Sequence, residues 1–160
     1  MSNFKSLVSG VGNLYKTKKY YDDWSEKYDE TLKLWNYQAP KKSLKISSGK
    51  KIYTKLQIKN FEQLHHYKIK FDLISLIGSM TYCKNFDKFF ANINKNIKEK
   101  GFVLFTHRID LWEKQDFLSI LKKHQKTLKI NKISRPLNYL PLNNDFKNKI
   151  KIKIVLLQKY

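Results

Sequence analysis

A stripe of large apolar side chains recurs at spacings of three and four residues near the start of the chain. Its members are Tyr21, Trp24, Tyr28, Leu32 and Trp35. This period predicts an amphipathic helix over residues 15–37, which follows a glycine-containing turn at residues 10–13. The helix is expected to end at Ala39-Pro40, because the residue before a proline is pushed out of the helical region.

The middle of the chain alternates short apolar runs with helical patterns. After a short helix at residues 41–48 and a strand at 52–58, it predicts in turn a strand, a helix, a strand and a helix, at residues 71–77, 86–97, 102–106 and 111–128. Parallel neighbours need a long connection, and strands buried on both faces read as continuous apolar runs. This order therefore predicts a parallel sheet with crossover helices.

The C-terminal region has a different pattern. Residues 129–134 and 149–158 flank a loop that contains Pro136 and Pro141, and lysine alternates with isoleucine over residues 149–154. Alternation with period two predicts an antiparallel pair with one solvated face, whose lysines would also protect an edge from pairing. The expected fold class is thus α/β, with a mostly parallel sheet and an antiparallel C-terminal strand pair.

The composition fits a single globular domain. The 160 residues are 41% hydrophobic and 14% aromatic with few glycines and prolines, which excludes collagen-like, low-complexity and fully disordered classes. One cysteine, Cys83, excludes an internal disulfide framework and a cysteine-based zinc site. We find no secretory signal and no apolar run long enough to cross a membrane, so we expect a cytoplasmic protein without membrane association.

The net charge of +20 is the strongest compositional signal. Only Arg108 and Arg135 among the basic residues are arginines, and the lysines are scattered along the chain. Sequence-specific readers of nucleic acid favour arginine, which forms forked hydrogen bonds with phosphates and base edges. The charge therefore favours non-specific attraction to polyanions at low salt over specific recognition.

Several segments together resemble a known enzyme family. The segment YYDDWSEKYD at residues 20–29, followed by YQAP at 37–40, resembles the lid helix of class I S-adenosylmethionine-dependent methyltransferases of the Williams-Beuren-region type. FDLI and GSMTY, at residues 71–74 and 78–82, resemble the fourth strand of that fold and its following loop. KGFVLFT at residues 100–106 resembles the fifth strand. The resemblance implies a truncated Rossmann-like methyltransferase fold.

The resemblance also implies a domain organisation. Residues 1–160 would form one methyltransferase-like domain, with lid helices in residues 1–40 and an incomplete core in 41–160. The glycine-rich loop, which this family places after its first strand, is missing between Pro40 and Lys41. A displaced loop at residues 9–13 is the less favoured alternative. We therefore expect S-adenosylmethionine to bind weakly or not at all.

By the same resemblance, the cofactor-binding residues are Tyr21, Trp24, Tyr28, Asn60, Gly78, Ser79 and Met80. The three aromatic residues would close over the methionine end of the cofactor, or would pack on the sheet. The Asn60 amide would accept from the adenine amino group, or form a turn. Gly78, Ser79 and Met80 follow a buried strand at its carboxyl end, where open α/β sheets bind ligands.

The candidate catalytic residues are His107 and Arg108, at the end of the next strand. Histidine titrates near neutrality, so His107 could act as general base toward the methyl acceptor. Arg108 could hold an anionic acceptor, or could pair with Asp110 or Glu113. No metal site is expected, because the adjacent His65 and His66 would diverge on either a strand or a helix.

The sequence leaves three functions open. The first is methyl transfer from S-adenosylmethionine to an acceptor of unknown identity, which we expect to be a small molecule. The second is a cofactor-free remnant that acts as a binding module and forms a homodimer, since loss of central strands would leave an exposed sheet edge. The third and least favoured is a basic nucleic-acid-binding protein.

Overall fold

The computed structural model describes residues 22–39, 67–144 and 149–160, together with residues 19, 42, 63 and 146. Most of the chain before residue 67 thus lies outside the described part, including the predicted turn at residues 10–13 and the predicted strand at 52–58. The chain divides into two compact units. The smaller unit consists of residues 1–38 and 138–150, and the larger of residues 39–137 and 151–160.

The smaller unit is organised around aromatic side chains. A 3-10 helix, η2 (Ser25–Lys27), leads into α2 (Tyr28–Leu34). The unit's core consists of Trp24, Trp35, Leu140 and Phe146. Trp24 packs against Trp35 at a ring-centroid distance of 5.5 Å. The indole N–H of Trp24 also donates to Thr31 Oγ1 at 3.3 Å, so the polar edge of the buried ring has a partner.

The first helix is shorter than its sequence pattern predicts. It ends at Leu34 instead of at Ala39-Pro40, because Asn36 adopts a left-handed backbone conformation with a φ of 53°. The N–H of Tyr37 then donates to the Leu32 carbonyl at 2.9 Å, and the N–H of Asn36 donates to the Lys33 carbonyl at 3.0 Å. These two bonds form a Schellman motif, for which asparagine is a suitable residue.

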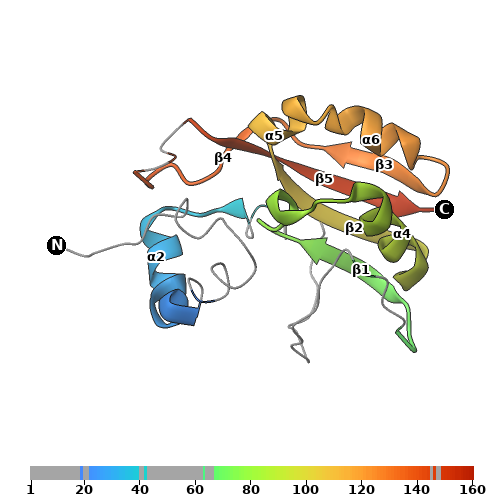
Figure 1. Ribbon diagram of the computed structural model, residues 1–160, viewed down its shortest axis with the longest axis horizontal. Helices are drawn as coiled ribbons and strands as arrows, with labels where there is room; N and C mark the ends of the chain where they lie inside the picture. Colours follow the sequence, from blue (N-terminus) through green and yellow to red (C-terminus); the bar gives the residue numbers. More distant parts are fainter. Residues whose placement is uncertain are drawn as a thin grey trace. The chain divides into compact units, whose positions relative to one another are not determined.

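The larger unit is built on a mixed sheet (Figure 1). Its elements are β1 (Phe71–Leu76), η3 (Met80–Tyr82), α4 (Phe86–Asn96), β2 (Ile97–Arg108), α5 (Ile109–Lys114), α6 (Phe117–Lys123), β3 (Leu128–Ile133), β4 (Leu137–Asn138) and β5 (Lys151–Lys159). The strands run in the order β1-β2-β5-β3, and β4 pairs with β5. β1 and β2 are parallel and are joined through α4, whereas β5 is antiparallel to both β2 and β3. The predicted α/β class with antiparallel C-terminal strands is confirmed.

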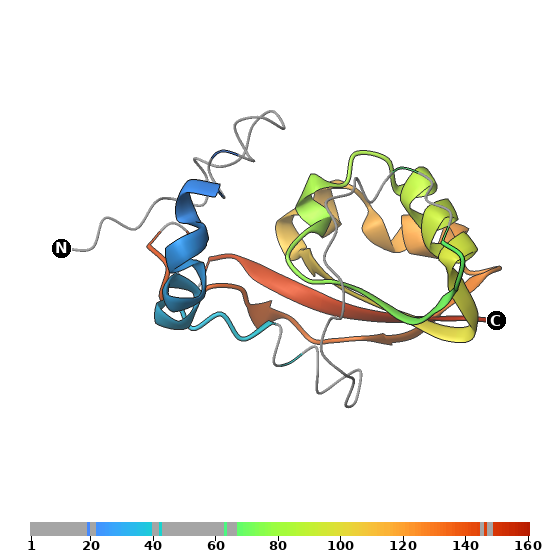
Figure 2. The same ribbon diagram turned by 90° about the horizontal axis from the view of Figure 1, so that it is seen from below.

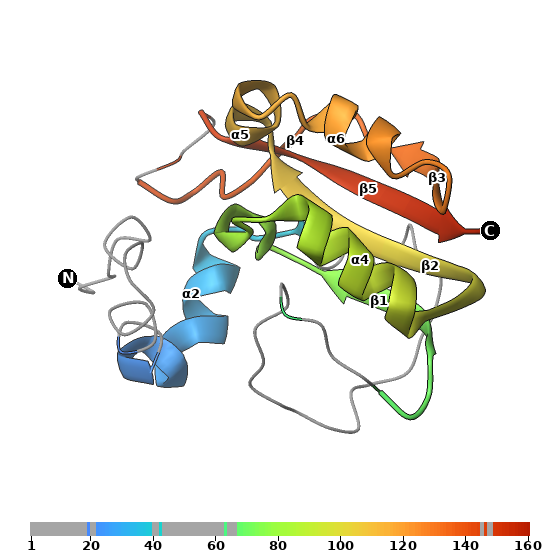
Figure 3. The ribbon, with the colours of Figure 1, turned by 45° about the vertical axis from the view of Figure 1, so that its right-hand side comes forward.

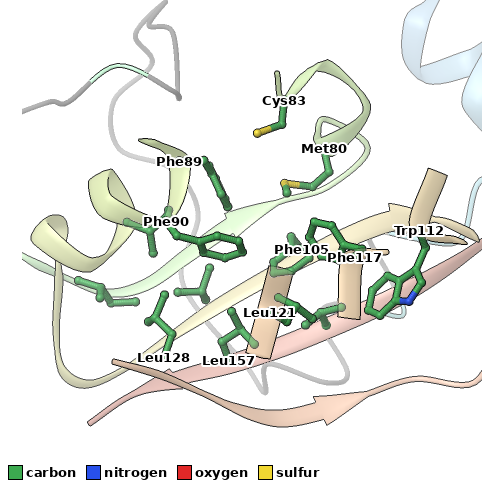
Figure 4. Packing of buried hydrophobic residues seen from close by; sticks show 14 residues of the cluster. Met80, Cys83, Phe89, Phe90, Phe105, Trp112, Phe117, Leu121, Leu128 and Leu157 are labelled. Atoms are coloured by element: carbon green, nitrogen blue, oxygen red, sulfur yellow. The ribbon is translucent and has the colours of Figure 1, made fainter. Parts of the chain in front are cut away.

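Helices α4, α5 and α6 all lie on one face of this sheet (Figure 2). The core beneath them is rich in aromatic residues, with Phe89 and Phe90 from α4 and Phe105 from β2 (Figure 4). Phe117 and Leu121 of α6 complete its centre. A second cluster contains Leu104, Ile154 and Leu156. Along β2 and β5, these residues alternate with the strand residues of the first core. Both strands are therefore apolar on two faces.

Strand β5 differs from its sequence prediction. The lysine and isoleucine alternation at residues 149–154 predicts a strand with one solvated face. In the structure β5 lies between β2 and β3, and Ile152 and residues 154–157 are all buried. The alternation holds over residues 151–154, where Lys151 is exposed and Ile152 and Ile154 are buried. It fails from residue 155 to residue 157, which are all buried, and the role in edge protection was wrong for this strand because β5 is paired on both sides.

The predicted helix at residues 111–128 is two helices. α5 ends at Lys114 and α6 begins at Phe117, and between them Asp116 has a left-handed φ of 46°. Aspartate tolerates this conformation better than most residues. The break lets Trp112 and Phe117 contact each other in the core with a centroid distance of 5.0 Å (Figure 3 shows the two helices in sequence).

Strand β2 begins earlier than predicted, at Ile97, where the helical pattern was expected to continue. The stretch of backbone that follows is tightly folded, with Lys100 at a φ of 62° and Gly101 buried. A Cβ atom on Gly101 would lie 2.8 Å from Ile97 Cγ1 and 2.8 Å from the Lys98 carbonyl oxygen.

We therefore predict that Gly101→Ala lowers the free energy of unfolding by about 1–3 kcal/mol, because the crowded backbone must shift. Urea unfolding measures the change. Lys88→Ala, at an exposed position of α4, is the control and should stay within about 0.5 kcal/mol of wild type. Equal losses in the two variants would contradict the packing argument.

Candidate functional site

The candidate site lies where the parallel strands β1 and β2 end. Leu76 is in register with Phe105, so the segment that follows β1 is adjacent to Thr106, His107 and Arg108. The carboxyl ends of parallel strands are where open α/β sheets bind ligands. The structure thus brings together five residues that the sequence singled out: Gly78, Ser79, Met80, His107 and Arg108.

One hydrogen bond ties the two strand ends together. The backbone N–H of Gly78 donates to Thr106 Oγ1 at 2.8 Å. Gly78 has a φ of 78°, a conformation that favours glycine, and Thr106 is only 2% exposed. The Gly78 amide is therefore used within the fold. The sequence did not predict this hydrogen bond of Thr106 with Gly78, although a polar residue at the end of an apolar run was a usable signal.

We predict that Thr106→Val lowers the free energy of unfolding by about 1–3 kcal/mol, because the half-buried Gly78 N–H loses its acceptor. Valine keeps the branched shape but lacks the hydroxyl. Thr106→Ser keeps the acceptor and should lose less, which denaturant unfolding of both variants tests. A serine variant that is less stable than the valine variant would mean that the Thr106 methyl group matters more.

Ser79 and Met80 have different surroundings. Met80 begins η3 and is 1% exposed, with its side chain in the core beside Cys83 (Figure 4). Cys83 is also buried. Ser79 precedes η3, is half-buried, and its hydroxyl forms no capping hydrogen bond with the helix. Of the three predicted residues in this loop, Ser79 is the one whose polar side chain is available near the surface.

His107 is enclosed by aromatic rings. It is 1% exposed, its ring lies 4.3 Å from the ring of Phe117, and Trp112 and Phe86 lie at centroid distances of 6.0 and 6.2 Å. Both ring nitrogens are buried without a hydrogen-bond partner of acceptable geometry in the described part of the chain. The Oε1 atom of Gln115 is likewise buried without a hydrogen-bond partner among the described residues. The sequence contained no signal that pointed to Gln115.

Burial determines how His107 titrates. Desolvation lowers its pKa from 6.5 to about 4, and the nearby Gln115 side chain and Arg108 backbone oppose this shift only in part. The sequence argument assumed an ordinary histidine that titrates near neutrality. In the structure the imidazole is neutral at pH 7 and closed off from solvent, so it holds its neighbours in place and is not exposed to an acceptor.

Arg108 is paired with Asp110. Its Nε donates to Asp110 Oδ1 at 3.0 Å and its Nη2 donates to Oδ2 at 2.6 Å, a bidentate geometry. The hydrogen bond from Arg108 lowers the pKa of the Asp110 carboxyl below its usual value. Of the two roles considered for Arg108, pairing with Asp110 is therefore the one that the structure contains.

The remaining predicted residues lie in the smaller unit or outside the described residues. Trp24 and Tyr28 belong to the smaller unit, where their rings are 4.7 Å apart and pack in its aromatic core. Tyr21 and Asn60 lie outside the described residues. His65 and His66 also lie there, and no cluster of three potential metal-binding side chains occurs among the residues that the structure describes.

Several groups at the strand ends are engaged within the fold itself. The Gly78 amide bonds to Thr106, the Met80 side chain is in the core, and Arg108 forms an ion pair with the carboxylate of Asp110. Ser79 is the half-buried polar residue beside these groups.

No helix among residues 22–39, 67–144 and 149–160 is long and apolar enough to cross a membrane.

No protein-family model matches the chain, and no curated protein matches it in sequence. Two solved structures of N-methyltransferase NodS from Bradyrhizobium japonicum WM9 are similar to 63% of the chain. The first, in complex with S-adenosyl-L-homocysteine, has 11% identity and a TM-score of 0.46, and the second has 12% identity and a TM-score of 0.41. The similarity covers 52% and 57% of the NodS chains, about half their length. We transfer no residue role from NodS at this level of likeness.

Proposed function

We propose that the protein is a class I S-adenosylmethionine-dependent methyltransferase-type domain that transfers a methyl group to an acceptor of unknown identity. The strand order supports this most directly. A parallel β1-α4-β2 unit is followed by an antiparallel strand pair, and this is the order that the resemblance of residues 71–82 and 100–106 implies. The sequence resemblance and the topology are separate observations that agree.

The proposal includes a shortened donor site. We infer that the glycine-rich loop is missing between Pro40 and Lys41, as the resemblance to the Williams-Beuren-region type suggests. Each lost charge-assisted hydrogen bond removes about 1.5–3 kcal/mol, so two or three of them move a micromolar site into the millimolar range. The small number of free polar groups at the described strand ends supports the same estimate.

The roles of the site residues follow from their surroundings. Ser79, half-buried at the carboxyl end of β1, is the residue that we expect to touch the donor. Arg108, whose partner Asp110 is exposed at the surface, is the residue that we expect to meet an anionic acceptor. His107 is a positioning residue, because its enclosed ring supports the segment that carries Arg108.

Calorimetric titration with S-adenosylmethionine and with S-adenosylhomocysteine tests the proposal. We expect binding with a Kd of the order of millimolar. Ser79→Phe should weaken it at least about tenfold, which corresponds to ~1.4 kcal/mol. Ser119→Phe, an exposed serine on α6, is the matched control and should leave the Kd unchanged.

The absence of heat up to millimolar ligand, in a protein that unfolds cooperatively, would reject the methyltransferase function. The domain would then be the cofactor-free binding module, and sedimentation would test whether it forms a dimer. Equal weakening by Ser79→Phe and Ser119→Phe would leave donor binding in place but reject the site at the end of β1.

A further inference from the structure

One part of the larger unit is basic without compensating acidic residues. No aspartate or glutamate occurs between residues 117 and 137, which include α6 and β3, and none occurs in residues 151–160, which include β5. By contrast, β1 contains Asp72, and α4, β2 and α5 each contain both acidic residues and lysines. Because α6 leads into β3 and β3 pairs with β5, the unbalanced lysines are brought together in space.

Four exposed lysines, Lys122, Lys126, Lys129 and Lys132, form what we call the basic strip. None of them makes an ion pair within the described part of the chain. Their neighbour Lys123 does, since its Nζ lies 2.8 Å from Asp87 Oδ2, and so does Lys159, which pairs with Glu99. No side-chain carboxylate of the described residues therefore neutralises the charge of the strip.

The strip follows the edge strand β3. Ile130 and Ile133 pack against the core that the helices cover. Lys129 and Lys132 alternate with these isoleucines along β3 and are exposed. Lys122 and Lys126 come from the end of α6 and the turn after it. The lysines thus extend around one edge of the sheet, beyond which no described strand continues.

An exposed aromatic ring lies at the start of the strip. Tyr160 is 62% exposed, its N–H donates to the Thr127 carbonyl at 3.3 Å, and Lys129 Nζ lies 5.9 Å from the centre of its ring. An accessible ring beside unneutralised lysines is the combination that binds single-stranded nucleic acid, where bases stack on aromatic rings and cations follow the phosphates. A duplex keeps its bases stacked on one another and has less use for such a ring.

We infer that the basic strip and Tyr160 form a binding surface for single-stranded nucleic acid without sequence preference. Lysine attracts phosphate as a point charge, whereas base-specific contacts usually need the forked donors of arginine. The surface is independent of the methyl-transfer proposal. On the neighbouring strand, Lys129 is in register with Gln158, which in turn pairs with Phe102 near the start of the paired part of β2. The candidate site lies at the opposite end of β2, where that strand ends at Arg108.

Fluorescence anisotropy with a labelled oligothymidylate of about 16 nucleotides tests the inference, in salt between about 50 and 200 mM. For single strands, the slope of log K against log salt is about −0.7 for each phosphate neutralised, which predicts about −3 for the four lysines. Lys129→Ala with Lys132→Ala should reduce the steepness by about 1.4.

The matched control is Lys68→Ala with Lys70→Ala. These exposed lysines precede β1 at the opposite edge of the described sheet, and the double variant makes the same change in net charge. It should leave the slope close to that of wild type. Tyr160→Ala should weaken binding about fivefold or more, whereas Tyr160→Phe should keep it, because phenylalanine preserves the stacking face.

Three outcomes would overturn the inference. Equal changes in slope for the two lysine pairs would mean that only the net charge matters. An unaltered affinity in Tyr160→Ala would remove the stacking contact. Binding to vesicles of phosphatidylserine and phosphatidylcholine, with no binding to the oligonucleotide, would make the surface a membrane contact. Because all the substituted side chains are exposed, thermal unfolding should confirm that each variant keeps its fold.

Discussion

Replacing Phe117 with alanine should lower the free energy of unfolding by about 3–5 kcal/mol. The Phe117 side chain is 0% exposed and has ring contacts with Phe86, Phe105, His107 and Trp112. It therefore joins α6 to α4, β2 and α5, and its loss leaves a cavity that several elements would have to fill. Denaturant unfolding monitored by circular dichroism measures the effect.

Leu118→Ala is the matched control for this prediction. Leu118 is the next residue of α6 but is exposed, so its truncation should cost less than about 1 kcal/mol. A small loss for Phe117→Ala, similar to that of the control, would mean that the aromatic cluster rearranges to fill the space and that the packing described here is not rigid.

The second large effect is a loss of stability between pH 6.5 and pH 4, caused by His107. Burial lowers the pKa of His107 in the folded state to about 4, while the unfolded chain keeps the ordinary value near 6.5. In this window the unfolded state binds the proton and the folded state does not, so stability falls as the pH falls. The contribution is complete above pH 6.5 and reaches a loss of about 3 kcal/mol near pH 4.

The variant His107→Phe isolates this effect. It keeps an aromatic ring among Phe86, Trp112 and Phe117 but cannot titrate. Unfolding measured at several pH values should give a flatter profile than wild type between pH 4 and 6.5, whatever its absolute stability. Parallel profiles for the two proteins would show that the imidazole is solvated and titrates normally. Asp110 and Asp87, whose pKa values are lowered, contribute only at more acid pH.

The sequence predicted the elements whose apolar pattern is continuous. Strand β1 and helix α4 differ from the prediction by one residue at their ends, and the antiparallel pairing of β3 with β5 is also as predicted. The errors in the helices occur where a single backbone conformation decides the outcome. Asn36 and Asp116 adopt left-handed conformations that end or divide a helix, and neither is a glycine that a pattern would reveal.

The candidate site was harder to predict because its chemistry depends on burial. The sequence placed His107 and Arg108 correctly at the end of a strand, but it contained no information on the rings around His107 or on the geometry that pairs Arg108 with Asp110. The contact between Gly78 and Thr106 joins residues 28 positions apart, so no local pattern could show it. The aromatic residues Trp24 and Tyr28 form a core of their own unit.

The position of β5 has a consequence for how the molecule assembles. β5 comes last among the described strands, yet it separates β2 from β3 in the sheet. During synthesis on a ribosome, β2 and β3 therefore emerge before the segment that must insert between them. Such non-local pairing slows folding and leaves strand edges unpaired for longer. We expect nascent chains that have not yet released residues 151–159 to remain open and to depend on chaperones.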